Sequence, residues 1–346
     1  MPIDDRATLS GMESSLPSKD DSSARTDLND VRVSESVVGP NLLESFGWVG
    51  GYFLLQNFAL AGTIGLIAFA AFGTLGISWS QLIELMVELD MDRSFVLIGV
   101  PGLAALLVIL PLVRWRLGRE WRDSLRLGRP TLQQVLLGLG AVVPLGILSD
   151  EVYRQVLLGW RTLWDIPEVS GTPLGALGEQ ILAVPYPILI VALALGPAVG
   201  EELVFRGLIG RGLTIRRGAV AGVLWTSLLF GAAHAFPPHA VATIFVGLFL
   251  HVLYLATGNL WVPILVHFFN NLLWVSLARF RIVDHLPNAP LVLMTACVYL
   301  AIIAWTLQPR ATRPAEHPHP QLSRESVFAG LGILNFTVTF VVNAVR

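Results

Sequence analysis

Apolar stretches of about 17 to 28 residues recur along this chain between short polar connectors. A helix of that length crosses the roughly 30 Å hydrocarbon core of a bilayer, because each residue adds ~1.5 Å along the helix axis. Of the 346 residues, 54% are hydrophobic and only 14% are charged, whereas roughly 25% are charged in an ordinary soluble domain. The sequence therefore excludes a soluble globule and predicts an all-α, polytopic transmembrane bundle.

Nine stretches are long enough to span the membrane, and the last of them also fits a helix that lies against the bundle. The sequence thus predicts eight or nine spans. The candidates cover residues 48–76, 94–113, 131–148, 183–205, 218–235, 240–257, 260–278, 290–308 and 327–345.

Composition divides the chain into four parts. Residues 1–45 are rich in Ser and Asp and contain no long apolar run, which predicts a disordered polar tail. N-terminal transmembrane helices are expected over 46–124, a core with unusual polar residues over 125–280, and C-terminal transmembrane helices over 281–346. Within the core, residues 150–166 mix Trp and Arg with apolar positions at helical spacing. This pattern predicts a separate amphipathic helix at the membrane interface, with a plain loop as the alternative.

Arginines set the expected orientation, because short cytoplasmic loops carry an excess of Lys and Arg. Three arginine-rich connectors follow the second, fourth and eighth spans and therefore fall on one side of the membrane. We expect a multi-pass protein of the cell membrane whose N-terminus and arginine-rich loops are cytoplasmic. These arginines are Arg114, Arg116, Arg119, Arg122, Arg126, Arg129, Arg211, Arg216, Arg217, Arg310, Arg313 and Arg324.

Net charge and cysteine content limit the partners, cross-links and metal sites that the chain can have. A net charge of −2 and the lack of a polybasic tail argue against a nucleic-acid partner. The single cysteine, Cys297, rules out an intrachain disulfide and a multi-cysteine metal site.

Three charged residues stand in the apolar segment GPAVGEELVFRGLIGRGL. An ionisable side chain within a span costs on the order of 3 kcal/mol, so it indicates a functional site by default. Glu202 and Arg206 are four residues apart and share a helix face, where an ion pair can form. Glu201 lies about 100° round the helix and is the carboxylate free to act as a base. The alternative is that all three residues cap a span at the cytoplasmic surface.

Two further clusters contain histidine. In LLFGAAHAF, Phe230 and His234 are four residues apart. In LVHFFNNLLW, His267 and Asn271 are four residues apart, with Asn270 beside them. The alternatives are a hydrogen-bonded core histidine in the first and helix-packing amides in the second.

The expected depth of Glu201 and His234 in the membrane favours one site that contains both residues. Glu201 and His234 are each about 16 residues, roughly 25 Å of helix, from the turn at 217–218. An antiparallel hairpin would place them at the same depth if the fourth helix continues to about Leu213. His267 would join them only if its helix is tilted or shifted.

This set of side chains suits amide hydrolysis in a polar intramembrane cavity. A carboxylate can deprotonate water held by a neutral imidazole, while a second imidazole and an amide donate to the oxyanion that forms at a peptide carbonyl. Two His and one Glu also match a catalytic zinc site with an open position, which Glu201, His234 and His267 would hold. The HExxH motif is absent, and the residues are compatible with zinc or with no cofactor.

Taken together, these motifs resemble those of the CPBP family of intramembrane proteases. This family groups Rce1-like CAAX prenyl endopeptidases with bacteriocin-processing and Abi-type proteins. Its three motifs, Glu-Glu-x-x-x-Arg, Phe-x-x-x-His and His-x-x-x-Asn, each lie on their own helix. The chain carries all three in order, in EELVFR, FGAAH and HFFNN, and the similarity covers about residues 125–275, beginning near LRLGRPTLQQ.

The resemblance makes 125–280 a protease core and implies a role for each residue. Glu201 is expected to activate water, His234 to hold that water, and His267 with Asn271 to form the oxyanion site. The family carries a metalloprotease name, whereas its eukaryotic-type members resemble metal-independent glutamate proteases. The implied partner is a membrane-associated or lipidated protein or peptide substrate, prenylated for a eukaryotic member. The supporting residues are Glu202, Arg206, Phe230 and Asn270.

Two other functions fit the same residues. A catalytically idle relative would serve as a bacteriocin-immunity or scaffold membrane protein. A proton-coupled transporter would relay protons through the buried Glu and His, although the chain lacks the repeated halves typical of transporters.

The remaining histidines are expected to lie outside the reaction. His251, seven residues before the turn at Gly258, is expected to pack in the core, with an approach to His267 as the alternative. His239, His285, His317 and His319 are expected to be solvated in connectors.

Overall fold

The computed structural model describes residues 39–74, 76, 78, 80, 81, 94–164, 184–234, 236–280 and 286–307. Over these residues the chain is helical and contains no strand. Five helices are long and apolar enough to cross a membrane. The chain is therefore an all-α, polytopic membrane bundle, as predicted. Most of the predicted tail, the predicted span at 327–345, and His285, His317 and His319 lie outside the described residues.

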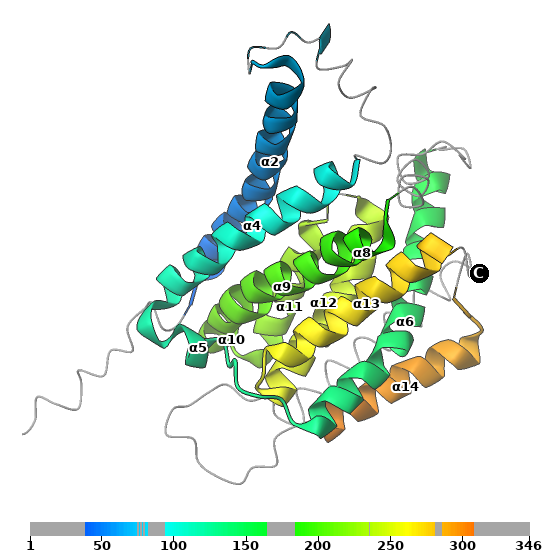
Figure 1. Ribbon diagram of the computed structural model, residues 1–346. Helices are drawn as coiled ribbons and strands as arrows, with labels where there is room; N and C mark the ends of the chain where they lie inside the picture. The colour runs from blue at the N-terminus through cyan, green and yellow to red at the C-terminus, as the bar shows by residue number, and fades with distance from the viewer. Residues whose placement is uncertain are drawn as a thin grey trace, which may run out of the picture. The chain divides into compact units, whose positions relative to one another are not determined.

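Eight of the nine predicted spans coincide with helices (Figure 1). The segments from α8 to α10 follow one another without a break and form one helical run. The elements are α2 (Leu42–Phe72), α4 (Ser94–Leu117), η2 (Gly118–Glu120), α5 (Trp121–Ser124), α6 (Leu132–Trp164), α8 (Tyr186–Leu189), η3 (Ile190–Leu195), α9 (Gly196–Glu202), η4 (Leu203–Gly210), α10 (Arg211–Arg217), α11 (Ala219–Ala232), α12 (Pro237–Thr257), α13 (Trp261–Phe280) and α14 (Pro290–Thr306).

Two predicted boundaries differ from the structure. Helix α2 begins at Leu42, inside the stretch expected to be tail, because Asn41 caps it by accepting a hydrogen bond from the Glu44 backbone N–H at 2.9 Å. Helix α6 continues through residues 150–164, so the helix predicted there is confirmed over the plain loop, but it continues the third span and is not a separate interfacial helix. The charged residues in this stretch do not end the helix, because Glu151 accepts hydrogen bonds from Arg154 and Gln155 within it.

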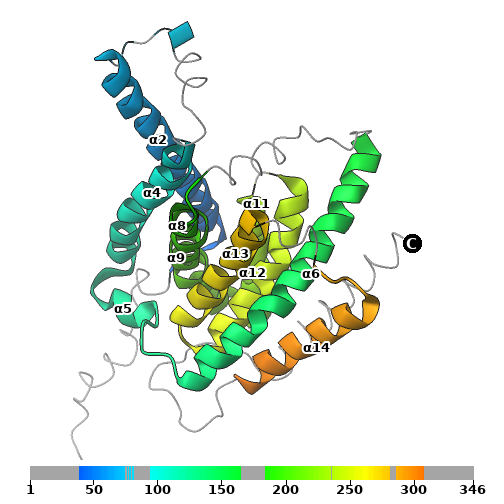
Figure 2. The same cartoon turned by 45° about the vertical axis from the view of Figure 1, so that its right-hand side comes forward.

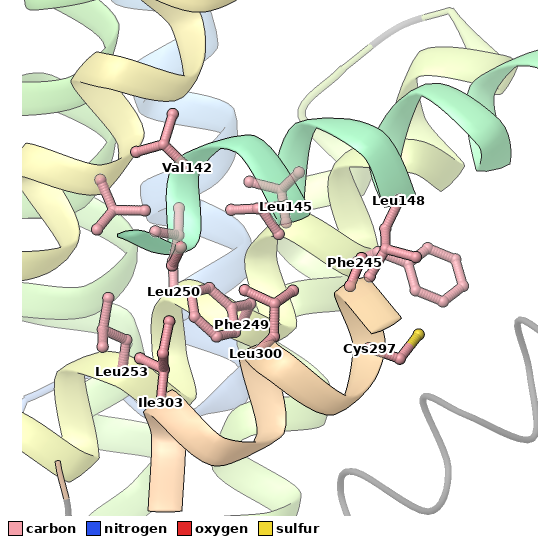
Figure 3. Close-up of a cluster of buried hydrophobic side chains, with 14 of the residues drawn as sticks. Val142, Leu145, Leu148, Phe245, Phe249, Leu250, Leu253, Cys297, Leu300 and Ile303 are labelled. Atoms are coloured by element: carbon pink, nitrogen blue, oxygen red, sulfur yellow. The ribbon is translucent and has the colours of Figure 1, made fainter. Parts of the chain in front are cut away.

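One hydrophobic core joins α6, α12 and α14. Helices α6 and α14 lie side by side in both Figure 1 and Figure 2, and α12 packs against α6. Their apolar side chains meet in a buried cluster that also contains Cys297 (Figure 3). The labelled members are Val142, Leu145, Leu148, Phe245, Phe249, Leu250, Leu253, Cys297, Leu300 and Ile303.

A second core surrounds the helical run from α9 to α10. All eight residues of η4 are buried, and they pack with apolar side chains from α4, α11 and α12. This core therefore holds the segment that carries Glu201, Glu202 and Arg206 in the middle of the bundle.

Two of the three arginine-rich connectors meet at one end of the bundle, and the third, with Arg310, Arg313 and Arg324, lies outside the described residues. Arg116 at the end of α4 pairs with Glu44 at the start of α2 at 2.6 Å, and Arg216 in α10 donates to the carbonyl oxygen of Gly39 at 3.3 Å. Asn259, in the α12–α13 turn, donates to a carbonyl of the α5–α6 connector at 2.7 Å. We call residues 118–131, 211–218 and 258–260 the arginine end.

Gly212 in α10 permits the closest backbone contact at this end. A methyl group on Gly212 would lie 2.3 Å from the carbonyl oxygen of Pro40, whereas a methyl group on Gly50 in α2 would meet no atom within 4 Å. We expect Gly212→Ala to lower the free energy of unfolding by about 1 to 3 kcal/mol. Gly50→Ala should be neutral or stabilising by up to about 1 kcal/mol. Thermal unfolding in detergent measures both, and equal stability of the two variants would contradict the packing.

Candidate active site

The first motif lies in the middle of the helical run from Tyr186 to Arg217. This run passes Leu213, which meets the condition for Glu201 and His234 to lie at the same depth, and it is longer than the predicted span of 183–205. The α-helical segment α9 ends at Glu202 and the chain continues as the π-helical segment η4. Such π-helical turns occur frequently at functional sites, because they change which side chains share a helix face.

Glu202 is the centre of a buried hydrogen-bond network. Its Oε1 atom accepts from the Nη1 of Arg206 at 2.7 Å and from the Nδ1 of His267 at 2.8 Å. The side chains of Glu202 and Arg206 are both 0% exposed. The predicted ion pair is thus confirmed, and it also holds His267, which the sequence did not indicate.

Two further contacts complete the surroundings of Arg206. Its Nη2 donates to the carbonyl oxygen of Gly247 in α12 at 3.1 Å. Its guanidinium carbon lies 4.4 Å from the centre of the Phe230 ring, a cation–π contact. The sequence did not indicate Gly247, because every residue has a backbone carbonyl and nothing in the sequence marks the one that binds Arg206.

Glu201 differs from its neighbour in being partly exposed and in accepting no hydrogen bond from a described residue, although each of the two carboxylates has a buried Oε2 without a partner there. Its side chain is 15% exposed, and its Oε2 atom is buried with no hydrogen-bond partner among the described residues. The Nε2 of His267 lies 3.9 Å from this oxygen, a separation that one water molecule can bridge. Sequence reasoning also missed Tyr52 of α2, whose hydroxyl packs against Gly200, the residue before Glu201.

His234 lies in the turn that follows α11. This helix has 14 residues, about 21 Å, so it is too short to cross a membrane and places the turn inside the bundle. The Nδ1 atom of His234 lies 2.9 Å from the carbonyl oxygen of Phe230. Since a carbonyl only accepts, Nδ1 carries the proton of the neutral ring, and Nε2 is left with a lone pair.

The aromatic ring of Phe230 is shared by both motif histidines. Its centre lies 5.1 Å from the ring of His234 and 5.9 Å from that of His267. The prediction that His239 lies in a connector is wrong, because it is in the first turn of α12, with its ring 4.8 Å from that of His234. Pro237 and Pro238 start this helix earlier than expected, since Pro is well accommodated in a first turn.

The two asparagines of the third motif occupy different environments. Asn270 is buried, and its Oδ1 has no hydrogen-bond partner among the described residues. It faces Gly146 of α6, where an added methyl group would come within 3.8 Å of that oxygen. Asn271 is half-buried. The structure therefore leaves both amides available, with Asn270 directed to the α6 side.

His251 does not approach His267. It is fully buried, and its Nε2 lies 3.2 Å from the hydroxyl of Thr214 in α10. The packing role expected for His251 is the one that the structure shows.

The three side chains predicted to hold a metal do not come together in the structure. Among the residues that the structure describes, no three His, Cys, Asp or Glu side chains are placed to hold a metal ion together. The Nδ1 of His267 is bound to Glu202, which leaves only its Nε2 to face a metal. Because the three side chains do not come together, Glu201, His234 and His267 do not form a zinc site in this arrangement.

A cavity of about 520 Å³ lies between α2 and α4. It is lined mainly by apolar side chains, among them Phe58 and Ile109, and it reaches Tyr52. The polar cavity expected around Glu201 is not this one and stays a prediction.

Comparison with known families supports the resemblance found in the sequence. Residues 183–273 match the family model described as type II CAAX prenyl endopeptidase, Rce1-like. The match contains all three motifs and confirms the resemblance to the CAAX protease family, over a shorter segment than the 125–275 expected. No curated protein and no solved structure matches the chain.

The buried ion pair generates a stability prediction. Arg206→Met leaves the Glu202 carboxylate buried with one fewer donor, so we expect it to lower the free energy of unfolding by about 3 to 5 kcal/mol. The double variant Glu202→Gln/Arg206→Met removes both charges and should lose less. Arg217→Gln, at an exposed position, is the control. A wild-type melting temperature for Arg206→Met would contradict the assignment.

Proposed function

We propose that this chain is an intramembrane endopeptidase of the CAAX-protease type, which hydrolyses a peptide bond with activated water. The observation that carries the proposal is the Glu201 carboxylate, which is 15% exposed, accepts no hydrogen bond from a described residue and lies 3.9 Å from His267, at the edge of the network formed by Glu202, Arg206 and His267. A buried carboxylate without a partner is costly in a resting protein, so its retention favours a reactive role.

Glu201 and His234 divide the activation of water between them. The Glu201 carboxylate accepts a proton from the water molecule as general base. The Nε2 lone pair of His234, which exists because Nδ1 donates to Phe230, accepts a hydrogen bond from the same water and orients it. The resulting hydroxide attacks the peptide carbonyl, and Glu201 then returns the proton to the leaving amine.

His267 and Asn271 supply the donors for the oxyanion. The Asn271 amide donates directly. The Nδ1 proton of His267 is committed to Glu202, so donation by Nε2 requires the doubly protonated ring. In this scheme Glu202 and Arg206 act by holding that ring in place.

The substrate class follows from the position of the site in a membrane bundle. The proposed substrate is a membrane-associated or lipidated protein or peptide, which enters from the cytoplasmic side. The arginine end is proposed to face the cytoplasm of a cell membrane, in keeping with the distribution of arginines.

Loss of the base is the direct test of this proposal. Purified wild type, Glu201→Gln and His234→Ala are compared on membrane-anchored and prenylated peptides, with Glu120→Gln, an exposed carboxylate, as control. We expect both site variants to lose about 10² to 10⁴-fold in kcat, and the control to keep wild-type activity.

Four outcomes would redirect or refute the proposal. Cleavage that disappears with a chelator and returns with Zn²⁺ would assign the water to a metal. Peptides cut equally by wild type and both variants would refute the roles of Glu201 and His234. Proton-coupled uptake in vesicles, sensitive to the same variants while no peptide is cut, would favour the transporter. Partner binding without either activity would favour the scaffold.

The two asparagines provide a second test. Asn271→Ala should lower kcat about 10² to 10³-fold, because it removes an oxyanion donor, and leave the melting temperature close to that of wild type. Asn270→Ala, which changes the contact with α6, should keep kcat within about tenfold of wild type. The reverse order of effects would assign the oxyanion donor to Asn270.

A further inference from the structure

Two guanidinium groups without an acidic partner lie near one buried tyrosine at the arginine end. Arg126 and Arg211 form no ion pair within 4 Å among the described residues. The Arg126 guanidinium lies over the Tyr254 ring, and Arg211 belongs to α10, which contacts the helix of Tyr254 through Thr214 and His251. We propose that Arg126, Arg211 and Tyr254 form a binding site for a phosphate group, separate from the hydrolytic site.

The backbone of Arg126 is held in an unusual conformation. Its φ of 56° lies in the left-handed region, the only such non-glycine value among the described residues. The connector is fixed there by the α12–α13 turn: the Leu260 N–H donates to the Arg126 carbonyl at 3.2 Å, and Asn259 donates to that of Gly128 at 2.7 Å. An arginine retained at a position that favours glycine indicates that the side chain is needed.

The side chains converge from three elements. The guanidinium of Arg126 lies 5.6 Å from the centre of the Tyr254 ring. Arg211, at the start of α10, has a buried Nη1 with no hydrogen-bond partner among the described residues. The Tyr254 side chain is 1% exposed, and its hydroxyl is likewise without a partner in the described part of the chain. The site thus holds several unused donors.

These donors suit an oxyanion. Arginine binds phosphate through parallel N–H···O bonds, and two neighbouring cations favour an anion between them because each otherwise repels the other. The site lies at the C-terminal end of α12, next to the half-exposed Trp261. Tryptophan is typical of the headgroup level of a membrane, where lipid phosphates lie. The phosphate can belong to an anionic phospholipid or be free in solution.

Lipid-dependent thermal stability of the full chain tests the proposal. Wild type, Arg126→Gln and Arg211→Gln are purified in detergent and titrated with phosphatidylglycerol, phosphatidylcholine or inorganic phosphate. Arg129→Gln and Arg217→Gln, two exposed arginines of the same end, are matched controls. We expect phosphatidylglycerol to raise the melting temperature of wild type and both controls. The apparent affinity should fall about tenfold or more in Arg126→Gln and Arg211→Gln.

The other titrations identify the source of the phosphate. Protection by phosphatidylglycerol alone assigns the site to a lipid headgroup, and protection by inorganic phosphate at millimolar concentration assigns it to a soluble phosphate. Equal protection of all five proteins, or none in wild type by either compound, would overturn the proposal.

Two further variants test the same site with less risk that the variant fails to fold. Arg126→Gly relieves the left-handed backbone, so it should be at least as stable as wild type without lipid, yet lose the response to phosphatidylglycerol. Tyr254→Phe removes only the hydroxyl and should weaken the response. Full retention of the response in Arg126→Gly would refute the role of this side chain.

Discussion

The arrangement of the site depends on the ion pair between Glu202 and Arg206, which is closed off from solvent. Removing two charges from water costs several kcal/mol each, and their attraction repays this only when further hydrogen bonds satisfy the remaining atoms. Here partners come from other helices: His267 from α13, the Gly247 carbonyl from α12 and the face of Phe230 from α11. The Oε2 of Glu202 and the Nε of Arg206 have no hydrogen-bond partner among the described residues, so the pair depends on these few contacts. The pair is therefore favourable only after these helices have closed around α9 and η4.

Close packing of those helices depends on glycines, which have no side chain to hold two helices apart. A methyl group on Gly210 would lie 2.1 Å from His251, and one on Gly231 would lie 2.3 Å from Ile244. Lipid gives no hydrophobic drive for helix association, so small residues that permit close contact supply the packing energy instead. The backbone around the site is thus rigid, and the Oε2 of Glu201 is left without a partner within it.

Much of the fold and part of the site could be predicted from local patterns. Apolar length located eight helices, and four-residue spacing predicted the pair of Glu202 with Arg206. What failed had different causes. The bond between Glu202 and His267, 65 residues apart, has no local signature. The continuity of α6 through residues 150–164 depends on hydrogen bonds within that helix, from Arg154 and Gln155 to Glu151, which the helical spacing of the apolar residues alone does not reveal. The boundary of α12, and with it the place of His239, depended on whether two prolines begin a helix or belong to a loop.

One face of α12 connects the proposed hydrolytic site to the arginine end. Gly247, His251 and Tyr254 follow one another at intervals of four and three residues, so they lie on the same side of the helix. Two of them meet groups of the opposing helical run and the third meets the α5–α6 connector. The Gly247 carbonyl accepts from Arg206, the Nε2 of His251 lies 3.2 Å from the Thr214 hydroxyl, and the Tyr254 ring centre lies 5.6 Å from the Arg126 guanidinium. Because a helix is stiff along its axis, a displacement of α12 at Tyr254 is transmitted to Gly247 and to the guanidinium that positions Glu202. An anion bound at the arginine end would therefore stabilise the same placement of α12 that the ion pair requires.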